Sequence, residues 1–363
     1  MRLLFVCPDM RTGGAERHWA TLVPALARRG ADARVLCLAE EGGLFEELTA
    51  AGVPVTCVHM RRRGDPRAWR RALAFANPRP EVVISRGVSG QFVGQAIASR
   101  ARAPHVLNEH TPLTPAGELL PMRRHQRLLT RLVAPRVDRV IAVTSRQIGP
   151  LARLGYRRER IEVIANGVFD SVRRPAPPAT AAAKPGEGDF TVLCAARLEP
   201  EKGVGVFIRA VDAARRSRPA IRGLVAGEGP ERPRLERLAA GSGVELLGVR
   251  DDVADLMAAA DAVALTSEAE ALPMSVLEAM AAARPVIVTD IGGMAEAVVQ
   301  GETGLLVPAG DAEAAARALV ELASDRERAG RMGEAGRARQ RERFDGDTMV
   351  ARYERTLASV AGV

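Results

Sequence analysis

Short apolar runs alternate with amphipathic helical patterns along almost the whole chain. This alternation is typical of parallel sheets flanked by helices. In the first half, the runs that we interpret as strands are 2–7, 33–38, 53–59, 82–85, 105–108, 139–143 and 162–164. A helix is predicted from about Ala15 to Arg29, because apolar residues recur there at helical spacing and Gly30 ends the pattern.

A proline-rich break at residues 172–189 interrupts this pattern and reads as a linker. A second series of strands follows at 190–195, 223–226, 244–247, 262–266, 286–289 and 304–307, with charged helices at 311–323 and 325–343. We therefore expect an α/β protein with two Rossmann-like domains, 1–171 and 190–348, whose parallel sheets face each other across a cleft. Residues 349–363 are expected to form a C-terminal helix that packs back on the first domain. Ligands should bind at the carboxyl ends of the strands.

Charge is distributed unevenly along the 363 residues. Residues 1–170 contain 27 Lys and Arg against 15 Asp and Glu, whereas the remainder contains 25 against 29. A basic half indicates either a solvated basic face or a surface for anionic partners such as phospholipid headgroups or diphosphate carriers. Nucleic acid is excluded as a partner, because aromatic residues are scarce and no binding module is recognisable.

The four cysteines lie in short apolar runs, form no CxxC pair and have no histidine at metal-ligand spacing. We expect buried free thiols in a reducing compartment. The apolar run at the N-terminus is too short for a signal peptide, and no run reaches the length of a membrane span. These features predict a cytoplasmic protein that contacts the inner face of the membrane peripherally, if at all.

Two glutamates, Glu270 and Glu278, frame a predicted strand-to-helix junction. A buried strand ends near Thr266, and Pro273 is well placed to start a helix. A carboxylate accepts hydrogen bonds from paired sugar hydroxyls, so one acid can hold a hexose and the other the ribose of a nucleotide. The spacing by itself is also compatible with two glutamates that only face solvent on a helix.

Two cations, Arg197 and Lys202, follow the first strand of the second series. A cation pair at a helix entrance suits a diphosphate whose charge grows as a glycosidic bond breaks. The adjacent glycines Gly13 and Gly14 let the backbone approach a ligand after the first strand. They do not form the GxGxxG fingerprint, which argues against a nicotinamide or flavin enzyme.

With these motifs in this order, the chain resembles glycosyltransferase family 4, the retaining enzymes with the GT-B fold. The likeness covers nearly the whole chain. The motifs that carry it are Gly13–Gly14, Ile164–Val168, Arg197–Gly203, Ala226–Pro230, Glu270 to Glu278, Gly292–Gly293 with Glu296, and Gly301–Val307.

The resemblance implies a role for each matching residue. Arg197 and Lys202 match the cations that bind the donor diphosphate. Glu278 matches the acid that binds the ribose, and Glu270 matches the acid that contacts the transferred sugar. The further donor-binding residues predicted in this way are Gly14, Asn166, Arg250, Ala271 and Leu272.

The family also carries a histidine near the primary hydroxyl of the sugar, and His110 is the best match because it follows a strand end. Glu109 beside it reads equally well as a cap or a salt-bridge partner. The family usually has Gly where this chain has Ala271, so the resemblance leaves the donor sugar open.

No metal or other cofactor is expected. No Asp-x-Asp motif stands at a strand end, and the adjacent Asp251 and Asp252 are interpreted as helix caps. Cations and helix dipoles can replace a metal in stabilising the leaving diphosphate.

We therefore predict transfer of a hexose, with retention, from a nucleotide-diphosphate sugar to a hydroxyl of a glycan, a lipid-linked acceptor or a small molecule. A UDP-sugar such as UDP-GlcNAc is the preferred donor, and GDP-mannose is the runner-up. A nucleotide-sugar epimerase of the same fold and a non-catalytic binding protein are the alternatives. Acceptor choice and membrane contact are assigned to basic loops of the first domain, at 60–63 and 121–124.

Overall fold

The computed structural model describes residues 1–10, 14–60, 62, 65–169 and 188–362. Its contacts divide the chain into two compact units. The first unit consists of Met1–Pro112, Glu118–Asn166 and Asp347–Val363, and the second of Leu113–Gly117 and Gly167–Gly346. Most of the predicted linker lies outside the described residues. Each unit is described by itself.

The first unit contains a seven-stranded parallel sheet in the order β3-β2-β1-β4-β5-β6-β7. Its strands are β1 (Arg2–Cys7), β2 (Asp32–Cys37), β3 (Val55–Cys57), β4 (Val82–Ser85), β5 (His105–Glu109), β6 (Arg139–Ala142) and β7 (Ile161–Val163). Every residue of β4 and β5 is buried, as expected for central strands with helices on both faces.

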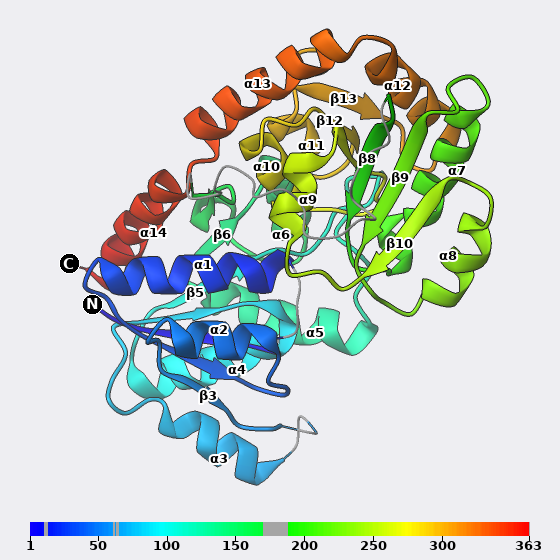
Figure 1. Cartoon of the computed structure of the whole chain (residues 1–363). Helices are drawn as coiled ribbons and strands as arrows, with labels where there is room; N and C mark the ends of the chain where they lie inside the picture. The colour runs from blue at the N-terminus through cyan, green and yellow to red at the C-terminus, as the bar shows by residue number, and fades with distance from the viewer. Residues whose placement is uncertain (11–13, 61, 63–64, 170–187, 363) are drawn as a thin grey trace. The chain divides into compact units, whose positions relative to one another are not determined.

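The helices of this unit are α1 (Gly14–Arg28), α2 (Gly43–Ala50), α3 (Pro66–Ala74), α4 (Gly87–Ala101), α5 (Arg124–Val133), α6 (Ile148–Arg153) and the C-terminal α14 (Gly346–Ala361). Figure 1 shows α14, in red, beside α1, in blue. Arg29, at the end of α1, pairs with Asp347 and Glu354 of α14 at 3.1 and 2.9 Å. The last helix therefore packs against the first.

The second unit contains a six-stranded parallel sheet in the order β10-β9-β8-β11-β12-β13. Its strands are β8 (Phe190–Ala195), β9 (Ile221–Ala226), β10 (Val244–Gly248), β11 (Ala262–Leu265), β12 (Val286–Thr289) and β13 (Gly304–Val307). Its helices are α7 (Val204–Arg215), α8 (Arg232–Ala239), α9 (Val253–Ala259), α10 (Met274–Ala281), α11 (Met294–Ala297), α12 (Ala312–Ser324) and α13 (Arg326–Arg343). Aliphatic side chains of α7 and α12 fill a core against this sheet.

The two parallel sheets with flanking helices confirm the predicted fold class. Most strand ends agree with the sequence pattern to within one or two residues. Strand β3 is shorter than predicted, because His59 has a φ of 49° and so leaves the extended conformation.

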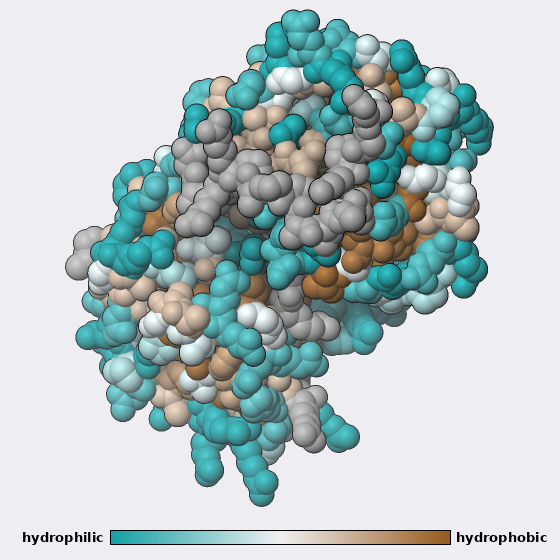
Figure 2. Space-filling model, viewed as in Figure 1, coloured by the Kyte–Doolittle hydropathy of each residue, from teal (hydrophilic) through white to brown (hydrophobic). Residues whose placement is uncertain are grey.

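The surface is largely polar on the visible face, where hydrophilic side chains cover α3 and the α12–α13 region (Figure 2). Large apolar side chains that remain exposed include Phe92, Leu128 and Leu132. Among the described residues, no helix combines the length and apolar character needed to cross a membrane.

Candidate functional site

The order of strands in the second unit reverses between β8 and β11, which are neighbours in the sheet. The loops that follow these two strands diverge there, and this switch point is where open parallel sheets bind ligands. The loop after β8 ends in a 3-10 turn, Pro200–Lys202, and the loop after β11 leads to α10. Lys202 and Glu270 come from these two loops.

The structure brings Lys202 and Glu270 into direct contact. Nζ of Lys202 donates to Oε1 of Glu270 at 2.7 Å, and the hydroxyl of Ser267 donates to the same oxygen at 2.9 Å. The two charged side chains are only 17% and 6% exposed. The chain has 52 lysines and arginines, yet Lys202 is the only lysine among the residues that the structure describes. The cation beside Glu270 is therefore a compact ammonium with rotatable donors rather than a guanidinium.

Backbone contacts hold the two loops together. Gly203 has a φ of 60°, and a Cβ at this position would lie 2.1 Å from the carbonyl oxygen of Thr266. The hydroxyl of Thr266 in turn donates to the carbonyl of Gly203 at 3.0 Å. Gly292 allows a similar approach, since its Cβ would lie 2.0 Å from the carbonyl oxygen of Glu270. Only glycine fits at these two positions.

The backbone of Glu270 is also paired with Leu113, with N–H···O distances of 3.1 and 2.8 Å. The next two residues, Ala271 and Leu272, have buried side chains. These two side chains therefore pack inside the unit rather than face solvent.

The other predicted donor-binding residues of this unit make local contacts. Arg197 is half exposed, and its guanidinium lies 3.9 Å from Glu199. Arg250 forms two hydrogen bonds with the carboxylate of Asp252, at 2.8 and 2.6 Å, and lowers the pKa of that carboxyl. Glu278 is partly buried in α10.

The interpretation of Asp251 and Asp252 as helix caps holds for the position of Asp252 but not for its side-chain contacts. Asp252 occupies the residue before α9, but its side chain makes no capping hydrogen bond. Its carboxylate is engaged by Arg250 instead, because a bidentate bond to a guanidinium is stronger than a bond to a backbone N–H.

In the first unit, the strand order reverses between β1 and β4. A cavity of about 160 Å³ opens there, lined by residues that follow the carboxyl ends of β1 to β4 and by side chains of α3 to α5. Trp69 and Phe92 meet edge to face in its wall, with ring centroids 5.8 Å apart. Of the predicted residues of this unit, Gly14 begins α1 and Asn166 is buried, while Gly13 lies outside the described residues.

His110 belongs to a polar cluster in this unit. Its Nε2 lies 3.0 Å from Oδ1 of Asn108, and its ring centroid lies 4.8 Å from that of His18. The indole of Trp19 donates to the same Asn108 oxygen at 2.7 Å. The amide nitrogen of Asn108 donates to the hydroxyl of Tyr353 at 2.8 Å.

Burial and the nearby positive charge of Arg86 keep both rings neutral. Burial lowers the pKa of His18 to about 3, and burial, with the positive charge of Arg86, lowers the pKa of His110 well below 6.5. The carboxylate of Glu109 makes a contact within its own loop, where it accepts a hydrogen bond from the backbone N–H of Thr111 at 2.6 Å, and burial raises its pKa.

The sequence interpretation missed three members of this cluster: Trp19, Asn108 and Tyr353. For Asn108 the sequence does contain a weak indication, because a polar residue that ends an apolar strand is often functional. For Tyr353 it contains none, since 245 residues separate Tyr353 from Asn108.

Comparison with known proteins now places the chain in a family. The model for glycosyltransferase family 4 matches residues 12–171, and the model for glycosyl transferases group 1 matches residues 189–325. A glycogen synthase of Mycobacterium tuberculosis is 30% identical over 397 residues, which cover 96% of this chain and 92% of that relative. The chain belongs to glycosyltransferase family 4.

Other family 4 proteins match over shorter lengths. A D-inositol 3-phosphate glycosyltransferase of Nocardia farcinica is 33% identical over 267 residues, or 68% of this chain and 59% of that relative. The chain thus matches less than two thirds of that protein.

The crystal structure of HepE from Anabaena in complex with UDP-glucose has a TM-score of 0.88 at 24% identity, covering 99% of this chain and 100% of HepE. This likeness shows a shared GT-B fold.

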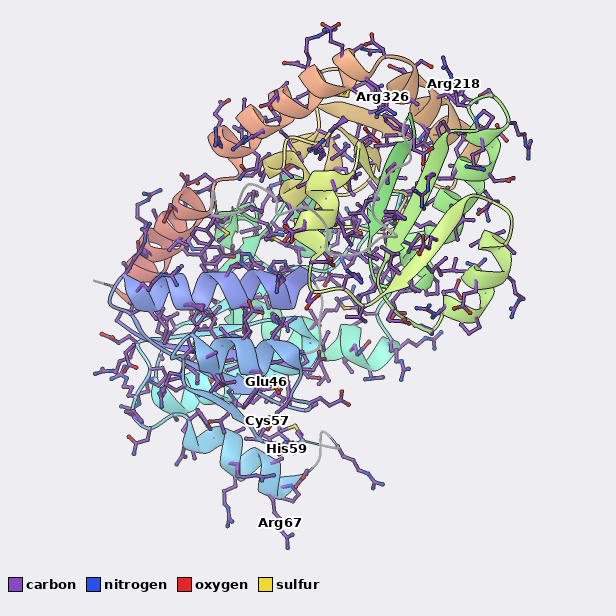
Figure 3. The ribbon with its side chains drawn as sticks, in the orientation of Figure 1. Glu46, Cys57, His59, Arg67, Arg218 and Arg326 are labelled. Carbon is purple, nitrogen blue, oxygen red and sulfur yellow. The ribbon has the colours of Figure 1, made fainter. Side chains whose placement is uncertain are left out.

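A second group of side chains lies apart from the family 4 motifs, at the edge strand β3. Sγ of Cys57 lies 3.6 Å from Nδ1 of His59, and Nε2 of that ring lies 3.4 Å from Glu41. Figure 3 shows Cys57 and His59 together between α2 and α3. The prediction that no histidine stands at metal-ligand spacing from a cysteine is wrong here, because His59, two residues after the end of β3, adopts the left-handed conformation with its Nδ1 beside the sulfur of Cys57.

Proposed function

We propose that this family 4 protein transfers a hexose, with retention of configuration, from a nucleotide-diphosphate sugar to a hydroxyl of a glycan, lipid-linked or small-molecule acceptor. The observation that carries the proposal is the nearly buried pair of Lys202 and Glu270 at the switch point of the second unit. Such a pair keeps a positive charge and a sugar-binding carboxylate ready in a site with little water.

Donor binding would redistribute the contacts of this pair. The diphosphate would accept hydrogen bonds from Lys202 and Arg197, whose charges would offset the negative charge that grows as the glycosidic bond breaks. Glu270, held by Ser267, would then orient the hexose hydroxyls. The leaving diphosphate would accept the acceptor's proton, so neither a carboxylate nucleophile nor a metal is required in this proposal.

The other predicted residues complete the proposed donor site. Glu278 would bind the ribose and Arg250 the base, while Gly14, Asn166, Ala271 and Leu272 would hold phosphate or sugar oxygens. A UDP-sugar such as UDP-GlcNAc is our first choice of donor, with GDP-mannose second. The crystal structures of HepE with UDP and with UDP-glucose support a uridine donor.

The first unit would bind the acceptor. Its cavity at the ends of β1 to β4 is walled by Trp69, Phe92, Met60 and Leu38, so it fits a partly apolar acceptor. Helix α5 also carries three arginines, at 124, 127 and 131, and Arg123 precedes it; Leu128 and Leu132 of the same helix are exposed. This combination favours peripheral binding to an anionic membrane.

Release of nucleoside diphosphate from a panel of UDP- and GDP-sugars, with and without acceptors, tests the transfer. We expect release that depends on acceptor and persists with a chelator, and a product that keeps the donor's anomeric configuration. Lys202→Ala and Glu270→Ala should each abolish most of the acceptor-dependent release. Arg216→Ala, which removes an exposed cation at the C-terminal end of α7, should leave the release unchanged. Conversion of donor alone would indicate the epimerase, and full activity in either site variant would contradict the assignment.

Co-sedimentation with anionic vesicles tests the membrane proposal separately. We expect binding that weakens as salt is added and that falls when Leu128 and Leu132 are changed to Ser. Equal sedimentation with neutral and anionic vesicles would contradict it.

A further inference from the structure

The polar cluster around Asn108 determines where the protons of its neighbours lie. The Asn108 side chain is fully buried, so its amide atoms need partners within the protein. The indole N–H of Trp19 can only donate, and the atom that it meets at 2.7 Å must therefore be the amide oxygen. The amide nitrogen then faces the hydroxyl of Tyr353.

This orientation fixes the tautomer of His110. The amide oxygen of Asn108 can only accept, so the His110 Nε2 that lies 3.0 Å away must carry a hydrogen. The ring is neutral at pH 7, because burial and the positive charge of Arg86 disfavour its protonation. Its second nitrogen, Nδ1, therefore carries a lone pair.

The same reasoning extends to His18 through Tyr353. The Tyr353 oxygen accepts from Asn108, and its own proton is best used on Nε2 of His18, 3.1 Å away. The hydrogen of the His18 ring then lies on Nδ1, a buried atom without a hydrogen-bond partner in the described structure. The reverse arrangement would leave both a hydroxyl proton and a ring nitrogen unpaired, which costs more.

We propose that Trp19, Asn108 and Tyr353 are positioning residues that fix the tautomer of His110, with its hydrogen on Nε2 and a lone pair on Nδ1. What this means for a ligand rests on the proposed function: a sugar hydroxyl at His110 can donate to Nδ1, whereas a deoxy or O-methyl group cannot.

The tautomers can be measured without donor or acceptor, by 15N-labelling the histidines and recording two-bond imidazole correlations at pH 7. We expect His110 to carry hydrogen on Nε2 and His18 on Nδ1. His105, which is buried between Ser85 and Gln95, serves as an internal control for the fold. A wild-type His110 with its hydrogen on Nδ1 would overturn the proposal.

Variants separate positioning from mere structural support. Asn108→Asp keeps the acceptor and adds a charge, so the pKa of His110 should rise while that of His105 stays unchanged. Trp19→Phe frees the amide to rotate and should give His110 a mixture of tautomers. Tyr156→Phe removes another buried hydroxyl, bonded to Gln91, and should leave His110 as in the wild type. An unchanged His110 in both Asn108→Asp and Trp19→Phe contradicts the positioning role, whatever the transfer assay shows.

A different observation, the group at β3, carries a second proposal. We propose that Cys57, His59 and Glu41, with Cys37 beside them, bind a divalent cation of the zinc type. One ligand atom from each of the first three lies within 4.8 Å of the others. Sγ of Cys57 and Nδ1 of His59 are 3.6 Å apart, close to the about 3.5 Å between sulfur and nitrogen on tetrahedral zinc.

A second sulfur lies near this group, although the thiol of Cys37 donates to the carbonyl of Glu40 at 3.1 Å and would have to leave it to reach a metal. Cys37 of β2 is the register partner of Cys57 on β3, so a second sulfur lies on the neighbouring strand. His59 adopts the left-handed conformation, which is costly for a histidine and is found at binding sites. Binding would release the thiol protons to solvent and draw Glu41 from His59 to the metal.

Titration of the reduced full chain with Co²⁺ tests this site. We expect thiolate charge-transfer and tetrahedral ligand-field bands that Zn²⁺ displaces at one equivalent. Cys57→Ser and His59→Asn should remove them, since asparagine tolerates the left-handed backbone. Cys194→Ser, a buried free thiol of the second unit, should not. Absence of the bands in the wild type, or their persistence in Cys57→Ser, would overturn the proposal.

Discussion

At the residue scale, the pair of Lys202 and Glu270 contains a lysine in a chain whose other cations are almost all arginine. Arginine supplies almost every other cation of this chain, yet the 17% exposed position beside Glu270 holds a lysine. A planar guanidinium carries its donors in a fixed fork and needs more room than an ammonium. Under the proposed function, the lysine would give the diphosphate a compact, rotatable donor.

We predict that Lys202→Arg lowers kcat of transfer at least about tenfold although the charge is kept, because the larger group displaces both carboxylate and diphosphate. Steady-state kinetics with the best donor measures this. Arg216→Lys, the reverse exchange at an exposed position, should leave kcat unchanged. Wild-type kcat in Lys202→Arg would show that charge alone suffices.

At the element scale, the loops after β8 and β11 are distant in sequence but held together, because glycines let their backbones come into contact. The sequence motifs identified both loops, and Gly203 lies in one of them. The contact of Gly203 with the carbonyl of Thr266 could not be foreseen, since it depends on β8 and β11 being adjacent in the sheet.

We predict that Gly203→Ala destabilises the protein by more than Gly301→Ala. Both positions have positive φ, of 60° and 76°, and share the cost of about 1–2 kcal/mol for a left-handed residue. Only at Gly203 would the new Cβ also collide with backbone, whereas nothing lies within 4 Å at Gly301. Urea unfolding measures the difference, and equal losses would argue against the tight loop contact.

At the scale of the whole molecule, the histidines are confined to one unit. All five, at 18, 59, 105, 110 and 125, belong to the first unit. Burial lowers the pKa of His18 and of His105 to about 3. The unfolded chain binds protons at these rings below about pH 6.5, whereas the folded chain does so only near pH 3.

We therefore predict that acidification from pH 7 to pH 5 destabilises the first unit selectively. At pH 5, each of these two rings should lower the free energy of unfolding of the first unit by about 2 kcal/mol. The raised pKa of Glu109 should offset part of this loss, because its carboxylate takes up a proton more readily in the folded state. Calorimetry as a function of pH measures it, with added UDP used to identify the transition of the second unit. Greater acid sensitivity in the transition that UDP shifts would contradict the prediction.

The sequence by itself determined the fold class, the two series of strands and the loops that carry Arg197, Lys202, Glu270 and Glu278. These features follow from short-range periodicity and turn chemistry. Tertiary structure decided which distant side chains meet: Lys202 with Glu270, Asn108 with Tyr353, and Cys57 and His59 with Glu41. It also decided that the carboxylate of Asp252, at the N-cap of α9, binds Arg250 rather than a backbone N–H of the helix. Such pairings depend on strand order and side-chain packing, which local sequence patterns do not specify.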